Sequence, residues 1–120
     1  MESIKRKGIS IDYGYLTNRK SIFSLIKSGF EIRNLCLKNN IDILHAFWGS
    51  TTGLISVIFA PCPVIVSFSG SDLIGTKNLS GTFTWGGIFN KLISNLISRM
   101  TAANITKTKE MKFILPRSAQ

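Results

Sequence analysis

The sequence predicts an α/β fold in which a parallel β-sheet carries helices on both of its faces. Short apolar runs that suit strands alternate with segments of helical period along the 120 residues, in the order strand, helix, strand, helix, strand, loop, helix, strand, helix. Alternation of this kind arises from right-handed crossovers between parallel strands. The hydrophobic content of 44% and the charged content of 18% are typical of a globular chain, and the length is enough for one core.

The first half of the chain supplies two expected strands and two expected helices. Residues 9–15 are expected to form a short strand, and residues 20–38 a helix that Asn39 and Asn40 end, since Asn tolerates the left-handed conformation. Residues 41–48, with the sequence IDILHAFW, suit a strand. A loop over 49–52 offers helix N-caps, and the helix expected over 54–60 stops at Pro61-Cys62-Pro63. One broad apolar face of the first helix comprises Ile22, Leu25, Ile26, Ile32 and Cys36.

The second half continues the alternation. Residues 64–68 read as a strand whose weak polarity alternation suggests cover on both faces. Residues 73–87 read as irregular, and Gly86-Gly87 could either hold a phosphate at the N-terminus of the next helix or form a flexible loop end, which we favour. The clearest helical pattern of the chain begins at Ile88. A short strand over 102–106 follows, and Thr108 can cap a last helix with Glu110 near its positive end.

Composition narrows the possible partners. The formal net charge of +9 favours an anionic partner, and nucleic acid, anionic lipid and phosphorylated small molecules all qualify. Two cysteines without metal-ligand spacing are expected to be free thiols of a reducing compartment, and with a single His they cannot complete a zinc site. No Asp, Glu, Lys or Arg occurs over 43–71, yet Gly and Pro interrupt this run, so a membrane-spanning helix is not expected.

Small polar residues follow the strand over 64–68 without any hairpin turn. In an open parallel sheet, ligands bind beyond the carboxyl ends of the strands. Asp72 could accept hydrogen bonds from a sugar hydroxyl or could cap its own loop. His45 could be a buried core residue, and Trp48 could either stack on a ligand or pack. The candidate residues at the three strand ends are His45, Trp48, Gly49, Ser69, Gly70, Ser71, Asp72, Thr106, Thr108 and Glu110.

Three stretches of the chain together resemble the N-terminal domain of glycosyltransferase family 4. They are "IDILHAFWGSTTGL", "PVIVSFSGSDLIG" and "LISNLISRMTAANITKTKEMKFILP", and the similarity covers 41–116 well and 20–40 more loosely. The resemblance implies a GT-B enzyme with two Rossmann-like domains that transfers a sugar from a nucleotide sugar with retention of configuration. It implies no metal and no cofactor other than this donor substrate. The implied acceptor is a saccharide or a lipid-linked molecule of cell-envelope biosynthesis.

The family's cleft-facing positions fall on residues of this chain. His45 matches the first His of the family's "HA" strand, and Gly49 matches the turn that follows it. Gly70, Ser71 and Asp72 match the loop after the family's fourth strand. Residues 106–110 match the strand-to-helix junction that faces the cleft. Ser69 stands where many members carry a His that is thought to touch the sugar. A hydroxyl cannot supply that basicity, so no catalytic residue is assigned.

The resemblance also bears on domain organisation and location. Residues 1–120 are expected to form a partial, acceptor-side Rossmann-like domain that lacks the donor-binding C-terminal domain and is inactive alone. The expected location is cytoplasmic, with peripheral contact on the inner, anionic face of the cell membrane. The alternative is a non-catalytic basic α/β module that binds an anionic membrane or nucleic acid. We favour the transferase, with nucleic acid as a less expected partner, because the motif order agrees with the βαβ pattern.

Overall fold

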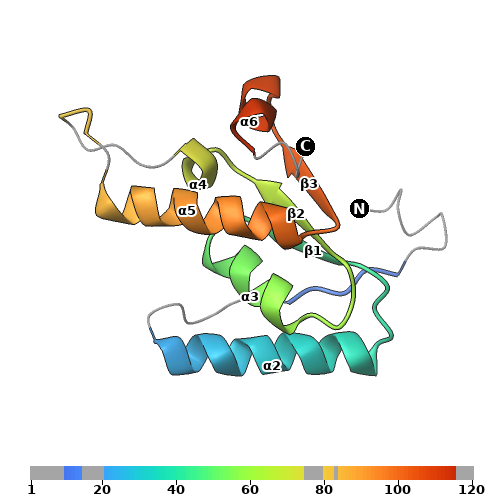
Figure 1. Cartoon of the computed structure of the whole chain (residues 1–120). Helices are drawn as coiled ribbons and strands as arrows, with labels where there is room; N and C mark the ends of the chain where they lie inside the picture. The colour runs from blue at the N-terminus through green and yellow to red at the C-terminus, as the bar shows by residue number, and fades with distance from the viewer. Residues whose placement is uncertain (1–9, 15–20, 75–79, 83, 116–120) are drawn as a thin grey trace.

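The structure, a computed structural model, describes residues 10–14, 21–74, 80–82 and 84–115. Three strands and five helices alternate along these residues (Figure 1). The elements are α2 (Ile22–Lys38), β1 (Leu44–Phe47), α3 (Thr51–Phe59), β2 (Val64–Phe68), α4 (Ser71–Ile74), α5 (Trp85–Met100), β3 (Ala103–Thr106) and α6 (Lys109–Ile114).

The strands form one parallel sheet in the order β1-β2-β3. Val66 at the centre pairs with Ala46 on one side and with Asn104 on the other. The expected parallel neighbours β1 and β2 are therefore confirmed, and the α/β class with them. Because all three strands run the same way, their carboxyl ends meet at one edge of the sheet, from which the chain enters α3, α4 and α6.

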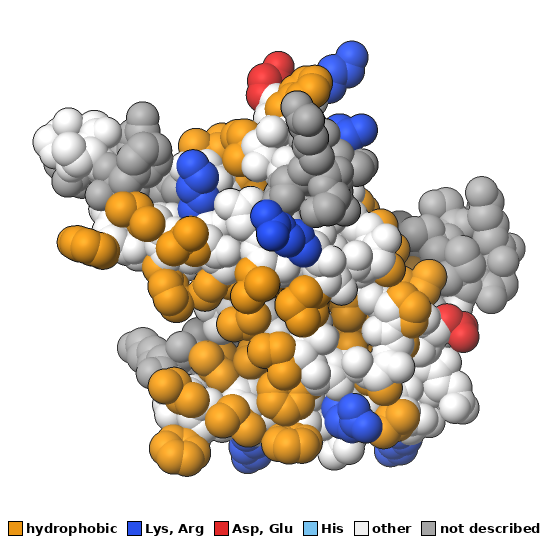
Figure 2. Space-filling view, viewed as in Figure 1, with side chains coloured by type: hydrophobic (Ala, Val, Ile, Leu, Met, Phe, Trp, Pro, Cys, Tyr) orange, Lys and Arg blue, Asp and Glu red, His pale blue; other side chains and the backbone are white. Residues whose placement is uncertain are grey.

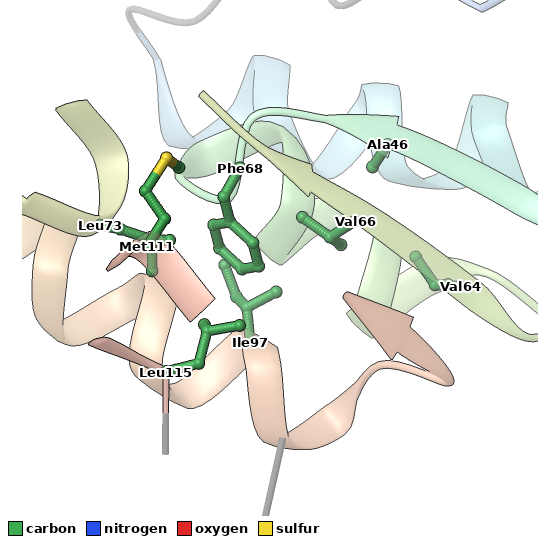
Figure 3. Close-up of a cluster of buried hydrophobic side chains, with 8 residues drawn as sticks. All are labelled: Ala46, Val64, Val66, Phe68, Leu73, Ile97, Met111 and Leu115. Atoms are coloured by element: carbon green, nitrogen blue, oxygen red, sulfur yellow. The ribbon is translucent and has the colours of Figure 1, made fainter. Parts of the chain in front are cut away.

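The core lies between one face of this sheet and the surrounding helices, with buried residues from α4, α5 and α6 and partly buried residues from α3. Val64, Val66 and Phe68 of β2 are buried and alternate with the half-buried Ile65 and Ser67. The alternation shows that the face of β2 that carries Val64, Val66 and Phe68 is the more deeply buried of the two. Figure 3 shows the buried cluster, which comprises Ala46, Val64, Val66, Phe68, Leu73, Ile97, Met111 and Leu115.

Some element boundaries differ from those expected. Residues 10–14 form no strand, while residues 9 and 15 of that expected element lie outside the described part. β1 begins only at Leu44, whose N–H donates to the carbonyl of Pro63, because Pro63 itself has no N–H to extend the pairing. Asn40 adopts a φ of 49°, as expected of the residue that ends α2.

The stretch expected to be irregular contains helical residues. The short helix α4 starts at Ser71, and α5 starts at Trp85, three residues before the expected Ile88. The hydroxyl of Thr84 accepts the N–H of Gly87 at 3.1 Å, which caps α5 and places Gly86-Gly87 inside its first turn. The expected loop end at these glycines is therefore wrong.

The helix α2 turns small residues inward. Its buried residues are Ser28, Gly29 and Cys36, whereas Ile22 and Ile26 of the expected apolar face are exposed. A Cβ atom at Gly29 would overlap the ring of Phe59, so the absence of a side chain there lets α2 approach α3 closely.

Among the helices described, none combines the length and apolarity that are needed to cross a bilayer.

Candidate functional site

The carboxylate of Asp72 ties together the loops that follow β1 and β2. Its Oδ2 atom accepts the N–H of Gly49 at 2.7 Å, and its Oδ1 atom accepts those of Ser69 at 3.0 Å and Gly70 at 2.9 Å. The residue is only 4% exposed. Charge-assisted hydrogen bonds of this kind are among the strong ones in proteins. Asp72 therefore acts as a clamp that sets the spacing between the two loops at the carboxyl edge.

Both backbone polar groups of Gly49 form hydrogen bonds. Its N–H donates to Asp72, and its carbonyl accepts the hydroxyl of the fully buried Ser94 of α5 at 3.1 Å. A Cβ atom at this position would overlap the ring of Phe68, so only glycine fits here without displacing that ring. The preceding Trp48 has a φ of 71° and is 47% exposed. A left-handed conformation is rare for a bulky residue. Two backbone hydrogen bonds hold Trp48 in it: its N–H donates to the carbonyl of Ser67 at 2.9 Å, and its carbonyl accepts the N–H of Gly53 at 3.1 Å.

Gly70 turns the chain from β2 into α4. Its φ of +115° is accessible to glycine and strained for other residues. Its carbonyl accepts the N–H groups of Leu73 at 3.0 Å and Ile74 at 2.8 Å, which starts the short helix. Ser69 is half-buried beside it, and Ser71, the first residue of α4, is exposed.

His45 lies apart from this edge. It is the second residue of β1 and exposed, on the face of the sheet opposite the buried Ala46. Its Nε2 atom lies 2.7 Å from the hydroxyl oxygen of Ser67, and its ring lies 4.6 Å from that of Phe47. The interpretation of His45 as a buried core residue is therefore wrong, because the side-chain alternation of β1 turns it outward.

The third strand end completes the edge. Thr106 pairs with Phe68 in register, and the hydroxyl of Thr108 accepts the N–H of Met111 at 3.3 Å, which confirms it as the cap of α6. Glu110 lies in the first turn of α6. Its own backbone N–H and the Thr108 hydroxyl donate to its carboxylate and lower the pKa of Glu110. Thr108 and Glu110 thus stabilise one another at the start of this helix.

The structure brings most of the sequence-predicted site residues to one edge. Gly49, Ser69, Gly70 and Asp72 share direct hydrogen bonds, with Trp48 and Ser71 beside them in the chain. Thr106, Thr108 and Glu110 belong to the neighbouring strand end, and His45 lies on the face of β1 opposite the buried Ala46. The side chains of Ser69, Ser71 and Thr106 bring hydroxyl groups to this edge, and these residues are half-buried or exposed. Hydroxyl groups can form hydrogen bonds with the hydroxyls of a sugar.

Two contributors to the site could not be found from the sequence. Ser94 reaches Gly49 across 45 positions, and Ser67 reaches His45 across 22. For Ser94 the one available signal is its place among the polar residues of the helical pattern that begins at Ile88, and this does not reveal its partner. For Ser67 the signal is the two-residue period of a strand, which puts it on the same face of β2 as Ile65.

A family model described as glycosyl transferase 4-like matches residues 3–107. This match includes all three strands and both loops that Asp72 joins. The chain belongs to the glycosyl transferase 4-like family. No curated protein and no solved structure matches it significantly. Membership of this family supports a glycosyltransferase function in general. The three-stranded parallel sheet and its surrounding helices form part of a Rossmann-like domain.

Proposed function

We propose that this domain binds the acceptor of a retaining glycosyltransferase at the carboxyl edge of its sheet. The observation that carries the proposal is the Asp72 clamp, which holds the loops of Gly49 and Gly70 in fixed register within a family domain of this type. A clamped pair of loops offers a preorganised surface, and preorganisation lowers the entropy that a ligand loses on binding.

We assign the acceptor contacts to residues at the edge that are exposed or half-buried. Ser71, Trp48 and Thr106 are at least partly exposed at the edge, while Asp72 is buried and its oxygens are filled by backbone donors. Ser71 and Thr106 would donate to and accept from sugar hydroxyls, and Trp48 would offer an apolar face to a sugar ring. Asp72 is a positioning residue in this scheme.

Catalysis of transfer needs groups beyond this edge. Ser69 takes the position of the family's sugar-contacting His, and its N–H is bound to Asp72, which fixes its place but gives it no basicity. We propose that the nucleotide-sugar donor is held by a second, donor-binding domain, and that no metal or cofactor takes part. The proposed acceptor is a saccharide or lipid-linked molecule of the cell envelope, used at the inner face of the cell membrane.

Amide chemical shifts of the ¹⁵N-labelled 120-residue chain test this assignment. Octyl β-glucoside, below its micelle concentration, serves as a lipid-linked saccharide probe, and UDP-glucose serves as a donor probe. We expect saturable shifts at Gly49, Gly70 and Ser71 with the glucoside only. Ser71→Ala should weaken this response, whereas Ser21→Ala, which removes an exposed hydroxyl that caps nothing at α2, should leave it intact. Shifts confined to other regions would refute the proposed site.

A further inference from the structure

The two cysteines of the chain lie side by side in the fold. Cys36 belongs to the last turn of α2, and Cys62 lies 26 positions later, in the loop between α3 and β2. A side-chain hydrogen bond joins their thiols, and both thiols are free. Folding therefore brings two reduced sulfur atoms into contact although they are far apart along the sequence.

The end of α2 fixes the position of Cys36. The N–H of Ile41 donates to the carbonyl of Cys36 at 2.9 Å, and that of Asn39 donates to the carbonyl of Leu35 at 3.0 Å. Together with the φ of 49° at Asn40, the bond from Ile41 is that of a Schellman motif, which ends a helix in a defined geometry. Cys36 is only 3% exposed, so neighbouring residues also restrict its side chain.

Prolines on both sides of Cys62 restrict its backbone. Pro61 and Pro63 fix their own φ angles, and a residue that precedes proline is confined to extended conformations. The carbonyl of Pro63 accepts the N–H of Leu44 at 3.0 Å, which ties this loop to the start of β1. Both cysteines are thus held in place by backbone contacts that do not involve their sulfur atoms.

The packing of α2 on α3 keeps the two thiols together. The rings of Phe30 and Phe59 meet edge to face with their centroids 5.2 Å apart, and the absence of a side chain at Gly29 makes room for the ring of Phe59. Figure 2 shows hydrophobic side chains gathered over the region where Figure 1 places these two helices. Apolar contacts of this kind maintain the contact of the thiols as long as the domain is folded.

We propose that Cys36 and Cys62 are an oxidation site, which a low-molecular-weight disulfide such as glutathione disulfide converts into one intramolecular disulfide. The site goes beyond the proposed function and does not depend on it. Disulfides in reducing compartments are transient or redox-sensing, so a pair that closes and reopens suits the free state of these thiols.

The reaction proceeds by two thiol–disulfide exchanges. The half-buried Cys62 reacts first: it loses its proton to solvent, its thiolate attacks one sulfur of the small disulfide, and one small thiolate leaves. Cys36 then loses its proton, attacks the sulfur of Cys62 and displaces the second small thiolate. The two protein thiols are oxidised, and the small disulfide is reduced to two thiols that take up the two protons.

The environment of Cys36 explains this order. Burial, followed by the adjacent Cys62, raises the pKa of Cys36, which disfavours its thiolate before the first exchange. Once Cys62 carries the mixed disulfide, Cys36 has an electrophilic sulfur beside it and needs no movement of α2 to reach it.

The disulfide would join the end of α2 to the loop that leads into β2. This loop lies at the amino ends of the parallel strands, and the Asp72 clamp lies at their carboxyl ends. A cross-link between residues this far apart in the sequence restricts the unfolded chain and leaves the folded backbone in place. Oxidation should therefore raise the stability of the domain and leave the clamped edge unchanged.

Treatment of the full 120-residue chain with glutathione disulfide tests the site. Mass spectrometry of the intact product should show a monomer lighter by two hydrogen atoms, with no glutathione attached. The midpoint of thermal unfolding should rise by about 10 °C, and dithiothreitol should reverse both changes.

Single substitutions distinguish the roles of the two cysteines. Cys36→Ala should retain one glutathione, because no second thiol is present to displace it. Cys62→Ala should react at least about tenfold more slowly than Cys36→Ala, since its one remaining thiol is buried. The same treatment should raise the unfolding midpoint of neither variant.

The equilibrium with glutathione provides a measurement on the wild-type chain alone. Because folding and disulfide formation favour each other, the equilibrium constant for closing the disulfide in buffer should exceed that in concentrated urea by about a hundredfold. Equal constants in buffer and urea would overturn the proposal. Glutathione retained on the wild-type chain, disulfide-linked dimers, or an unchanged unfolding midpoint after oxidation would overturn it as well.

Discussion

Replacement of Asp72 by Ala should cost the domain much of its stability. Asp72 is only 4% exposed, and its carboxylate accepts the backbone N–H groups of Gly49, Ser69 and Gly70. The substitution removes this acceptor and leaves the three N–H groups without it. A hydrogen bond to a charged group contributes about 1.5–3 kcal/mol, and a buried donor left unpaired costs about 1–3 kcal/mol. Water that enters the vacated space recovers part of this cost. We therefore expect a loss of about 3 kcal/mol in the free energy of unfolding.

Urea denaturation followed by circular dichroism measures this loss, and the midpoint of thermal unfolding should fall by about 10 °C or more. Asp72→Asn keeps one carbonyl oxygen and should cost less than Asp72→Ala. Asp42→Ala removes an exposed carboxylate and should change stability by no more than about 0.5 kcal/mol. If Asp72→Ala unfolds like the wild type but no longer responds to the octyl glucoside, Asp72 binds the ligand directly and the clamp is refuted.

Three further predictions follow from the same edge and from the two thiols. Gly49→Ala should cost about 1–3 kcal/mol because its Cβ overlaps the ring of Phe68, whereas Gly86→Ala, which meets nothing within 4 Å, should not destabilise; urea unfolding compares the two. The purified 120-residue chain should release no nucleotide from UDP-glucose above a boiled control, and measurable transfer would contradict the proposed division between donor and acceptor domains. Ellman's reagent should label the half-buried Cys62 before the buried Cys36. Burial and the adjacent Cys62 thiol raise the pKa of Cys36 and disfavour its reactive thiolate. Faster labelling of Cys36 would contradict this prediction.

The sequence predicts the order of elements well because each signal is local. Val64 to Phe68 form the expected strand, and the helix that starts near residue 20 ends at Asn39-Asn40 as expected. The role of Asp72 could not be decided in this way. Its partner Gly49 lies 23 positions away, and only the parallel pairing of β1 with β2 brings the two loops together.

The direction in which α5 faces also escapes sequence reasoning. A period of 3.6 residues shows that one side of a helix is apolar, but it does not show which side meets the core. Here the inward side carries Gly87, Ser94 and Ser98, since small residues allow α5 to lie close to α3 and α4. The large apolar residues Trp85, Phe89 and Leu92 are consequently left outside, which is the reverse of the usual arrangement.

These two features meet in a single helix. Ser94 on the inner side of α5 holds the carbonyl of Gly49, whose N–H is held by Asp72. Leu92 and Leu96, two positions before and after Ser94, are exposed on the outer side of the same helix. The helix α5, whose large apolar side chains face outward, is therefore hydrogen-bonded directly to the loop that presents the proposed acceptor site.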